Sequence, residues 1–233
     1  MPSKNGKLIP IICKNIDECF TWKGPAVVVD VLRFSTTVCA ILVTGKKNLR
    51  VYDKKEKAIE YKNTTFNLEF FSELDFENYF PKFDNSPYVA LTQSNPNKDA
   101  VIITNAGAKT VLSLKKASDI FIGCFANFSA VTRHLNKFSG EVLLIPSSLF
   151  GPPHIEDSLC CDAFNGFLFG RTDSITTAMD KLKETNRPEE FLKSCPQTGY
   201  QDLALALAVD KFTTLPCAKI QGDYAVIENI ISL

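Results

Sequence analysis

The chain has 233 residues, of which 45% are hydrophobic and 22% are charged, which is the composition of an ordinary globular protein with a sizeable core. Its 26 basic and 26 acidic residues cancel, and this balance excludes a strongly basic nucleic-acid or membrane-surface binder. We therefore expect no nucleic acid and no membrane as partners, and any bound anion must be held by local groups.

The chain shows no membrane span or export signal. No apolar run reaches the ~18 residues that a bilayer span needs, and the N-terminus MPSKNGKLIPIICKN lacks the apolar core and cleavage site of a signal peptide. We expect a cytoplasmic protein. Eight cysteines form no CxxC pair, and six lie beside apolar residues, so buried free thiols are favoured over disulfides.

Four times along the chain, an apolar strand is followed by a polar turn and a helical pattern. The strands are expected at Val27–Val29, Val101–Thr104, Ile120–Gly123 and Val142–Ile145. The helices are expected to begin near Ser35 or Thr36, after Gly107, near Asn127 or Ser129, and near Ile155. Alternating strands and helices predict right-handed crossovers and a three-layer α/β/α fold with a mostly parallel sheet.

The segment between the first two units is polar and aromatic. A helix is expected near Lys55–Lys62, followed by a phenylalanine-rich excursion from Phe66 to Phe83 and by turns within DNSPYVALTQSNP. We expect this excursion to be either a dimer surface or a lid over a pocket. The first alternative would make the protein a homo-oligomer, and the sequence does not decide between the two.

The C-terminal third predicts three helices and a hairpin. The helices are expected near Asp173–Glu184, Pro188–Ser194 and Gln201–Asp210, and LPCAKIQGDYAVIENI predicts a hairpin that turns at Gly222 and Asp223. Since no linker is rich in Gly, Ser or Pro, we expect a single domain over residues 1–233. Residues near 1–115 and 116–233 are candidate internal halves.

Polar side chains follow the first predicted strand, at the sheet edge where open α/β sheets place ligands. Asp30 is either a capping residue or a carboxylate ligand of a hard cation such as Mg²⁺. Arg33 either forms a salt bridge with Asp30 or clamps an anion bidentately. Ser35 and Thr36 either cap the next helix or help its N-terminus and Arg33 to bind a phosphate.

The other strand ends add further candidates. The turn Asn105–Ala108 supplies an amide side chain and a glycine that permits close backbone approach. Glu156 and Asp157 either only meet the helix dipole or complete a magnesium site or hold a nucleophilic water. His154 is either incidental, a base or a phosphate donor.

With these residues assembled, the chain resembles the 2-phosphosulfolactate phosphatase family. VVVDVLRFSTTVCAIL is similar to that family's Asp-Val-Leu-Arg signature, which is followed by hydroxyl residues and a helix. The resemblance continues in order through five further blocks: DNSP, ITNAGAKTVL, IGCFANFSAVTRHL, IEDSLCCDAF and QDLALALAVDKFTTLP. The six blocks cover most of the chain from about residue 25.

The resemblance implies an α/β fold and magnesium-dependent hydrolysis of (R)-2-phospho-3-sulfolactate to sulfolactate and phosphate, a step toward coenzyme M. Carboxylates would hold the cation, and Arg33 with helix-start groups would bind a small anionic phosphorylated substrate. Carried over to matching positions, it implies catalytic residues Asp30, Arg33, Glu156 and Asp157, of which Asp30, Glu156 and Asp157 are metal ligands. The implied substrate-binding residues are Arg33, Ser35, Thr36, Asn85, Ser86, Asn105, Gly107 and Asn127.

The chain departs from the family's pattern at several positions. The family commonly has a small residue at Phe34, Gly at Asp84, a hydroxyl residue after its Asn-Gly step where this chain has Ala106 and Ala108 around the glycine, and Ser at His154. These changes alter the bulk, charge and hydroxyl count expected in the pocket, and with them the substrate.

Three alternatives stay open at this stage. The first is whether an aspartyl-phosphate forms at Asp30 or water attacks directly. The second is a non-catalytic, anion-binding relative, and the third is a transferase that acts on a nucleotide or sugar phosphate.

Overall fold

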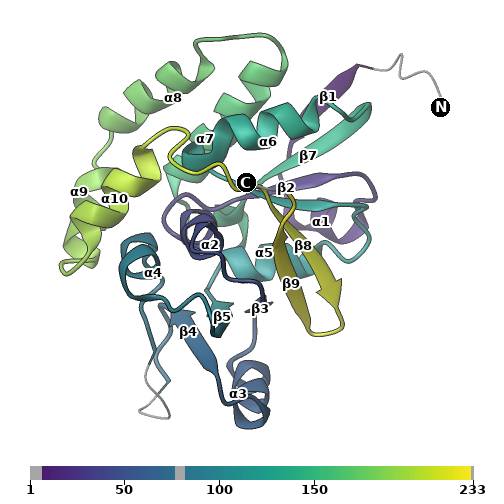
Figure 1. The fold of residues 1–233 in the computed structure, drawn as a ribbon. Coiled ribbons are helices and arrows are strands. Elements are labelled where there is room, and N and C mark those ends of the chain that lie inside the picture. The colour runs from purple at the N-terminus through teal and green to yellow at the C-terminus, as the bar shows by residue number, and fades with distance from the viewer. Residues whose placement is uncertain (1–6, 77–81, 232–233) are drawn as a thin grey trace.

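The computed structural model describes residues 7–76 and 82–231, and these form a nine-stranded sheet with helices on both faces (Figure 1). The predicted three-layer α/β fold with a mostly parallel sheet is confirmed. The single domain over 1–233 and its halves stay predictions.

The sheet consists of two parallel groups of strands joined by an antiparallel hairpin. The first group contains, in sheet order, β1 (Leu8–Ile12), β7 (Gly140–Pro146), β2 (Ala26–Val29) and β6 (Ile120–Gly123). The second contains β3 (Leu49–Tyr52), β5 (Asp99–Ile103) and β4 (Leu68–Ser72). The hairpin of β8 (Pro216–Gln221) and β9 (Tyr224–Asn229) lies between them, antiparallel to β6 on one side and to β3 on the other.

The four strands expected from apolar runs are present as β2, β5, β6 and β7, and the hairpin turns at Gly222 and Asp223 as predicted. Every residue of β2 and β6 is buried, as expected for parallel strands that are covered on both faces. Strands β1, β3 and β4 were not predicted, because their short apolar runs are interrupted by Pro10, Arg50 and Glu69, respectively.

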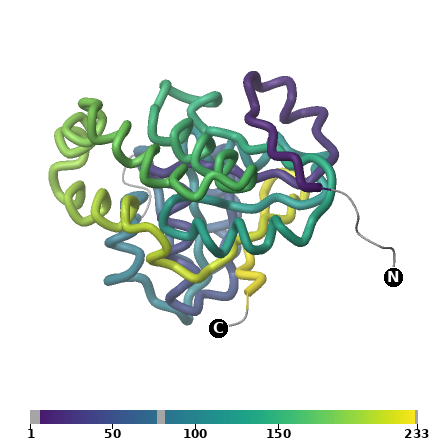
Figure 2. The backbone as a smooth tube through the Cα atoms, turned by 90° about the horizontal axis from the view of Figure 1, so that it is seen from above, coloured from purple at the N-terminus to yellow at the C-terminus, as the bar shows by residue number. Residues whose placement is uncertain are grey.

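The helices of the described residues cover the two faces of the sheet, and the last three along the chain lie beyond it on one side (Figure 1). Their bounds are α1 (Ile16–Thr21), α2 (Phe34–Val43), α3 (Lys55–Thr64), α4 (Pro87–Gln93), α5 (Gly107–Ser113), α6 (Phe128–Leu135), α7 (Ile155–Leu168), α8 (Ser174–Lys183), α9 (Arg187–Ser194) and α10 (Gly199–Leu207), with short 3₁₀ helices at Phe125–Asn127 and Ser147–Phe150. Helix α7 packs on β1, β7 and β2, and α5 packs on β2, β3 and β9. Helices α8, α9 and α10 lie at the opposite end of the molecule from β1 and α1 (Figure 2).

The phenylalanine-rich segment contributes three side chains to the core, although Phe66 at its start is 96% exposed. Phe70 and Phe71 belong to β4 and are buried, and Phe76 is buried against Phe70. The expectation of a lid or dimer surface is therefore wrong for these side chains. Tyr79 and Phe80, within the same segment, lie outside the described residues.

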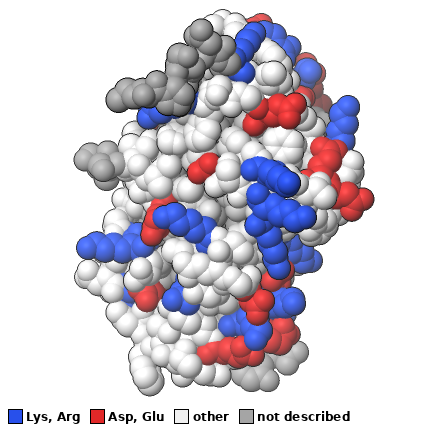
Figure 3. Space-filling view, turned by 90° about the vertical axis from the view of Figure 1, so that its right-hand side faces the viewer, with Lys and Arg blue, Asp and Glu red and all other residues white. Residues whose placement is uncertain are grey.

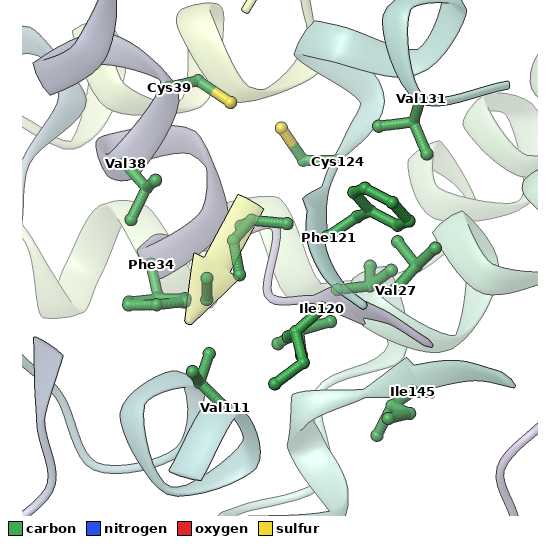
Figure 4. Close-up of a cluster of buried hydrophobic side chains, with 14 of the residues drawn as sticks. Val27, Phe34, Val38, Cys39, Val111, Ile120, Phe121, Cys124, Val131 and Ile145 are labelled. Atoms are coloured by element: carbon green, nitrogen blue, oxygen red, sulfur yellow. The ribbon is translucent and has the colours of Figure 1, made fainter. Parts of the chain in front are cut away.

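Phe34 is also a core residue. Its ring is fully buried and lies in the cluster that includes Val38 and Val111 (Figure 4). The expectation that Phe34 adds bulk to a substrate pocket is wrong, because its side chain points into the core. Helix α2 begins at Phe34 itself, one or two residues before the predicted start.

All eight cysteines are free thiols; seven are buried and Cys195 is partly exposed, as expected from their apolar neighbours. Among the described residues, no helix is long and apolar enough to cross a membrane. Side chains of both charge signs are interspersed on the face seen in Figure 3, in keeping with the zero net charge.

Candidate functional site

Asp30 follows β2 directly and lies at the start of α2. Its Oδ1 accepts a hydrogen bond from the N–H of Phe34 (3.0 Å), and its carbonyl oxygen accepts one from the N–H of Ser35 (2.8 Å). The residue is only 7% exposed. Burial, followed by the negative charge of Glu73, raises the pKa of Asp30 to about 7. Asp30 is thus a capping carboxylate that titrates near neutral pH.

Asp157 joins the ends of β2 and β7. Its Oδ1 accepts from the N–H of Val31 (2.8 Å) and its Oδ2 accepts from the N–H of Ser148 (3.1 Å). Burial and then the charge of Asp30 raise the pKa of Asp157 well above its ordinary value. The two predicted catalytic aspartates are therefore brought together, and the charge of Asp30 disfavours ionisation of Asp157.

Glu156 is held by an arginine that the sequence analysis did not single out. Its carboxylate is fully buried and accepts from Nε of Arg187 (2.9 Å to each oxygen) and from Nη2 (2.8 Å to Oε1). Its predicted role as a metal ligand does not fit this arrangement, because both of its oxygens are engaged by one guanidinium. His154 precedes α7, and burial followed by the charge of Arg187 lowers its pKa, so it carries little charge for a phosphate at pH 7.

Arg33 pairs with two acids, neither of which is Asp30. Its Nη1 and Nη2 donate to Oδ2 and Oδ1 of Asp84 (2.6 and 3.0 Å), and Nη1 also donates to Oδ2 of Asp202 (3.1 Å). The predicted alternative of a salt bridge between Arg33 and Asp30 is therefore wrong. The peptide bond between Leu32 and Arg33 is cis.

A pocket of about 500 Å³ opens beside Arg33. It lies between the strand-end residues and the loop that joins α9 to α10. The lining residues are Arg33, Glu73, Asp84, Asn105, Ser194, Cys195, Pro196, Gln197 and Thr198. The pocket is thus lined by one buried cation, Arg33, and by two carboxylates, those of Glu73 and Asp84, and these groups suit a polar ligand.

Three further predicted residues lie around Glu73 or Asp30. The N–H of Asn105 donates to Oε1 of Glu73 (2.7 Å), and Nδ2 of Asn85 lies 3.5 Å from its Oε2. Oδ1 of Asn85 is buried without a hydrogen-bond partner. Gly107, at the start of α5, presents its backbone N–H to Asp30 and thereby lowers that residue's pKa, against the larger effect of burial.

The other predicted binding groups are used internally. Oγ of Ser35 accepts from the N–H of Asp30 (3.0 Å), and Oγ1 of Thr36 donates to the carbonyl of Val31 (2.8 Å). Both hydroxyls are fully buried and bond the segment between β2 and α2, so they neither cap α2, whose N-cap residue is Arg33, nor face a phosphate.

Asn127 and Ser86 are likewise structural. The Asn127 side chain accepts from the N–H of Cys124 (2.9 Å) and donates to the carbonyls of Ile122 and Thr214, so its amide is used within the fold. Oγ of Ser86 donates to Oδ1 of Asp202 (2.6 Å) and accepts from the first turn of α4, which it caps. Ser86 therefore supports the partner of Arg33 without lining the pocket.

Three residues of the site were missed by sequence reasoning: Glu73, Arg187 and Asp202. Glu73 follows β4, so the rule that ligands gather at strand ends would have found it had that strand been recognised. Asp202 was within a quoted block, QDLALALAVDKFTTLP, but gave no signal of its own. Arg187 is the first residue of α9, and its partner Glu156 lies 31 residues away in the chain, so no neighbouring residue in the sequence indicated the pair.

The arrangement suits a cation only in part. Among the described residues, no group of three or more His, Cys, Asp or Glu side chains is gathered as a metal site. Mg²⁺, however, often takes only one or two protein carboxylates and keeps water and substrate oxygens as its other ligands. Asp30, with Glu73 near enough to raise its pKa, and the unpartnered Oδ1 of Asn85 are oxygen donors of the required kind.

Comparisons with known proteins agree on one family. The model of a family described as 2-phosphosulpholactate phosphatase matches residues 12–220. The chain is 25% identical over 210 residues to a protein named "Probable 2-phosphosulfolactate phosphatase" from Caldanaerobacter subterraneus subsp. tengcongensis, which covers 83% of this chain and 87% of that protein.

Two archaeal relatives are named 2-phosphosulfolactate phosphatase. The protein from Methanocaldococcus jannaschii is 28% identical over 210 residues, covering 82% of this chain and 84% of its own. The protein from Methanothermobacter thermautotrophicus is 29% identical over 155 residues, covering 66% of each chain.

Proposed function

The chain belongs to the 2-phosphosulfolactate phosphatase family, and we propose that it hydrolyses 2-phosphosulfolactate or a similar small phosphorylated hydroxy acid to the hydroxy acid and phosphate. The observation that carries the proposal is the pocket of about 500 Å³, which places Arg33 among the residues that follow the parallel strands. A cytoplasmic location and a step toward coenzyme M are part of the same proposal.

Arg33 is suited to hold an anionic group of the substrate. A guanidinium presents parallel N–H groups that match two oxygens of a carboxylate, phosphate or sulfonate. The bidentate contact with Asp84, at 2.6 and 3.0 Å, supports this role, because a carboxylate that lines the pocket already pairs both of its oxygens with this fork.

Asp30 is suited to take a proton from the attacking water. A general base is most effective when its pKa lies near the working pH, and the pKa of Asp30 is raised to about 7. Asp157 lies close enough for its charge to be coupled to that of Asp30, while backbone N–H groups of Val31 and Ser148 hold it in place. Covalent attack by Asp30 on phosphorus remains the alternative to direct attack by water.

We further propose that the reaction depends on Mg²⁺. Glu73 and the Oδ1 of Asn85 would hold the ion beside Asp30, and the ion would supply positive charge to the phosphate oxygens. Glu156 has no part in this proposal, because Arg187 engages its carboxylate.

A panel of phosphate esters, assayed for phosphate release with Mg²⁺ and with EDTA, tests the function. The panel contains 2-phosphosulfolactate, 2-phospholactate, a sugar phosphate and an aryl phosphate. We expect release from the small hydroxy-acid esters and its loss in EDTA. Binding of these esters without release would instead favour the non-catalytic relative, for which the occupied fork of Arg33 is the supporting observation.

A further inference from the structure

Asp84 occupies the anion-binding fork of Arg33 from within the chain. Its two carboxylate oxygens receive the two parallel N–H donors of the guanidinium, at 2.6 and 3.0 Å. An acid group of a bound ligand would use the same two donors. The fork is therefore filled by a side chain of the protein itself.

The two acidic partners of Arg33 differ in how firmly they are held. Asp202 is fully buried and also accepts hydrogen bonds from Ser86 Oγ (2.6 Å), the N–H of Tyr88 (3.1 Å) and Thr198 Oγ1 (2.8 Å). It remains a counter-charge for Arg33 whatever else the pocket contains.

Asp84, by contrast, can be replaced by a ligand. Its side chain is 44% exposed and lines the pocket, while that of Arg33 is 7% exposed. Its carboxylate also accepts a hydrogen bond from the neighbouring N–H of Asn85 (2.8 Å), which a rotated, exposed side chain exchanges for one to water.

We propose that Asp84 is a specificity-determining residue, an internal carboxylate that competes with an anionic group of the substrate for Arg33. The inference rests on the proposed function, since it takes this pocket as the substrate site. An ester whose carboxylate, sulfonate or phosphate reaches Arg33 must first displace Asp84. The Asp84 carboxylate thus raises the KM of such esters, because binding must break its contact with Arg33. It leaves kcat little changed, because that contact is already broken in the bound complex, before the chemical step.

Binding of inorganic sulfate to the full-length chain tests the competition without requiring turnover. Calorimetry at constant ionic strength and without divalent metal compares the wild type with Asp84→Asn and Asp84→Gly. Asparagine keeps an acceptor for the N–H of Asn85 and removes only the charge. We expect sulfate to bind about tenfold more tightly to both variants, which corresponds to about 1.4 kcal/mol.

Two matched variants separate competition at the fork from a general change of charge. Glu73→Gln removes a carboxylate from the same pocket but not from the fork of Arg33. Asp180→Asn removes one that pairs with Lys183 on α8 and does not line the pocket. Both should tighten sulfate binding by less than about threefold, and adding Arg33→Lys to Asp84→Asn should abolish the gain.

Equal sulfate affinity in the wild type and both Asp84 variants, or an equal gain in Glu73→Gln, overturns the proposal. Thermal unfolding of each variant verifies that it is folded. A gain in sulfate affinity together with an inactive ester panel would overturn the proposed function while sustaining the competition. Phosphate release from the ester panel, together with an unchanged sulfate affinity in the Asp84 variants, would sustain the proposed function and overturn the competition.

Discussion

The ring of Phe34 packs so closely on Gly107 that a Cβ atom at residue 107 would lie 2.4 Å from the ring's Cγ and Cδ1 atoms. Phe34 is the first residue of α2 and Gly107 the first of α5, so this contact determines how closely the two helix starts approach. The backbone N–H groups of both residues interact with Asp30. The pair therefore shapes the backbone around the candidate catalytic carboxylate without lining the pocket.

Gly107→Ala should destabilise the protein, because its new methyl group overlaps the Phe34 ring within a fully buried contact. Overpacking of this kind costs ~1–3 kcal/mol of unfolding free energy, measurable by urea denaturation. Phe34→Leu, which removes the ring, should recover part of that loss when the two are combined. If the effects of the two changes on the unfolding free energy are additive, overlap with the Phe34 ring is not the cause of the loss in Gly107→Ala.

The sequence was sufficient for the strands that are apolar throughout, such as Ile120–Gly123, because parallel strands are buried on both faces and carry a strong signal. It was insufficient for the partners of Arg33. Asp84 and Asp202 lie 51 and 169 residues away in the chain, and only the packing of α4 and α10 brings them to the guanidinium. Glu73 was missed for the same reason, since its position depends on the unrecognised strand β4.

Arg187→Met should be strongly destabilising, because it leaves the carboxylate of Glu156 buried and unpaired. Loss of one partner of a buried ion pair typically costs ~3–5 kcal/mol, and urea unfolding would measure it. The combined variant Glu156→Leu with Arg187→Met should be closer to the wild type, since it leaves no buried charge.

Glu156→Gln distinguishes this structural role from that of a metal ligand. In the structural role, the variant loses stability but keeps the same Mg²⁺ requirement for phosphate release. A folded variant that needs much more Mg²⁺ would contradict the assignment of Glu156 to Arg187.

Stability should fall as the pH rises from about 4 to about 7, owing in part to Asp30. The unfolded chain loses this proton near the ordinary value of 3.8, whereas the folded protein retains it until about pH 7. Between these values the folded state binds more protons, so the unfolding free energy decreases by up to ~1.4 kcal/mol per pH unit. The raised pKa of Asp157 acts in the same direction. Asp30→Asn should have a flatter profile than the wild type in urea titrations from pH 4 to 8, and parallel profiles would contradict the raised pKa.

Asp30→Asn should also abolish phosphate release while leaving the fold intact. The asparagine Oδ1 can still accept the hydrogen bond from the N–H of Phe34, so α2 remains capped, and a buried charge is removed at neutral pH. Its amide, however, cannot take a proton from water or attack phosphorus, so the rate should fall by at least ~10²-fold. Phosphate release and circular dichroism measure the two effects, and Asp162→Asn, an exposed position on α7, controls for loss of a carboxylate elsewhere. Near-normal turnover by folded Asp30→Asn would remove Asp30 from the mechanism and leave Asp157 as the candidate base.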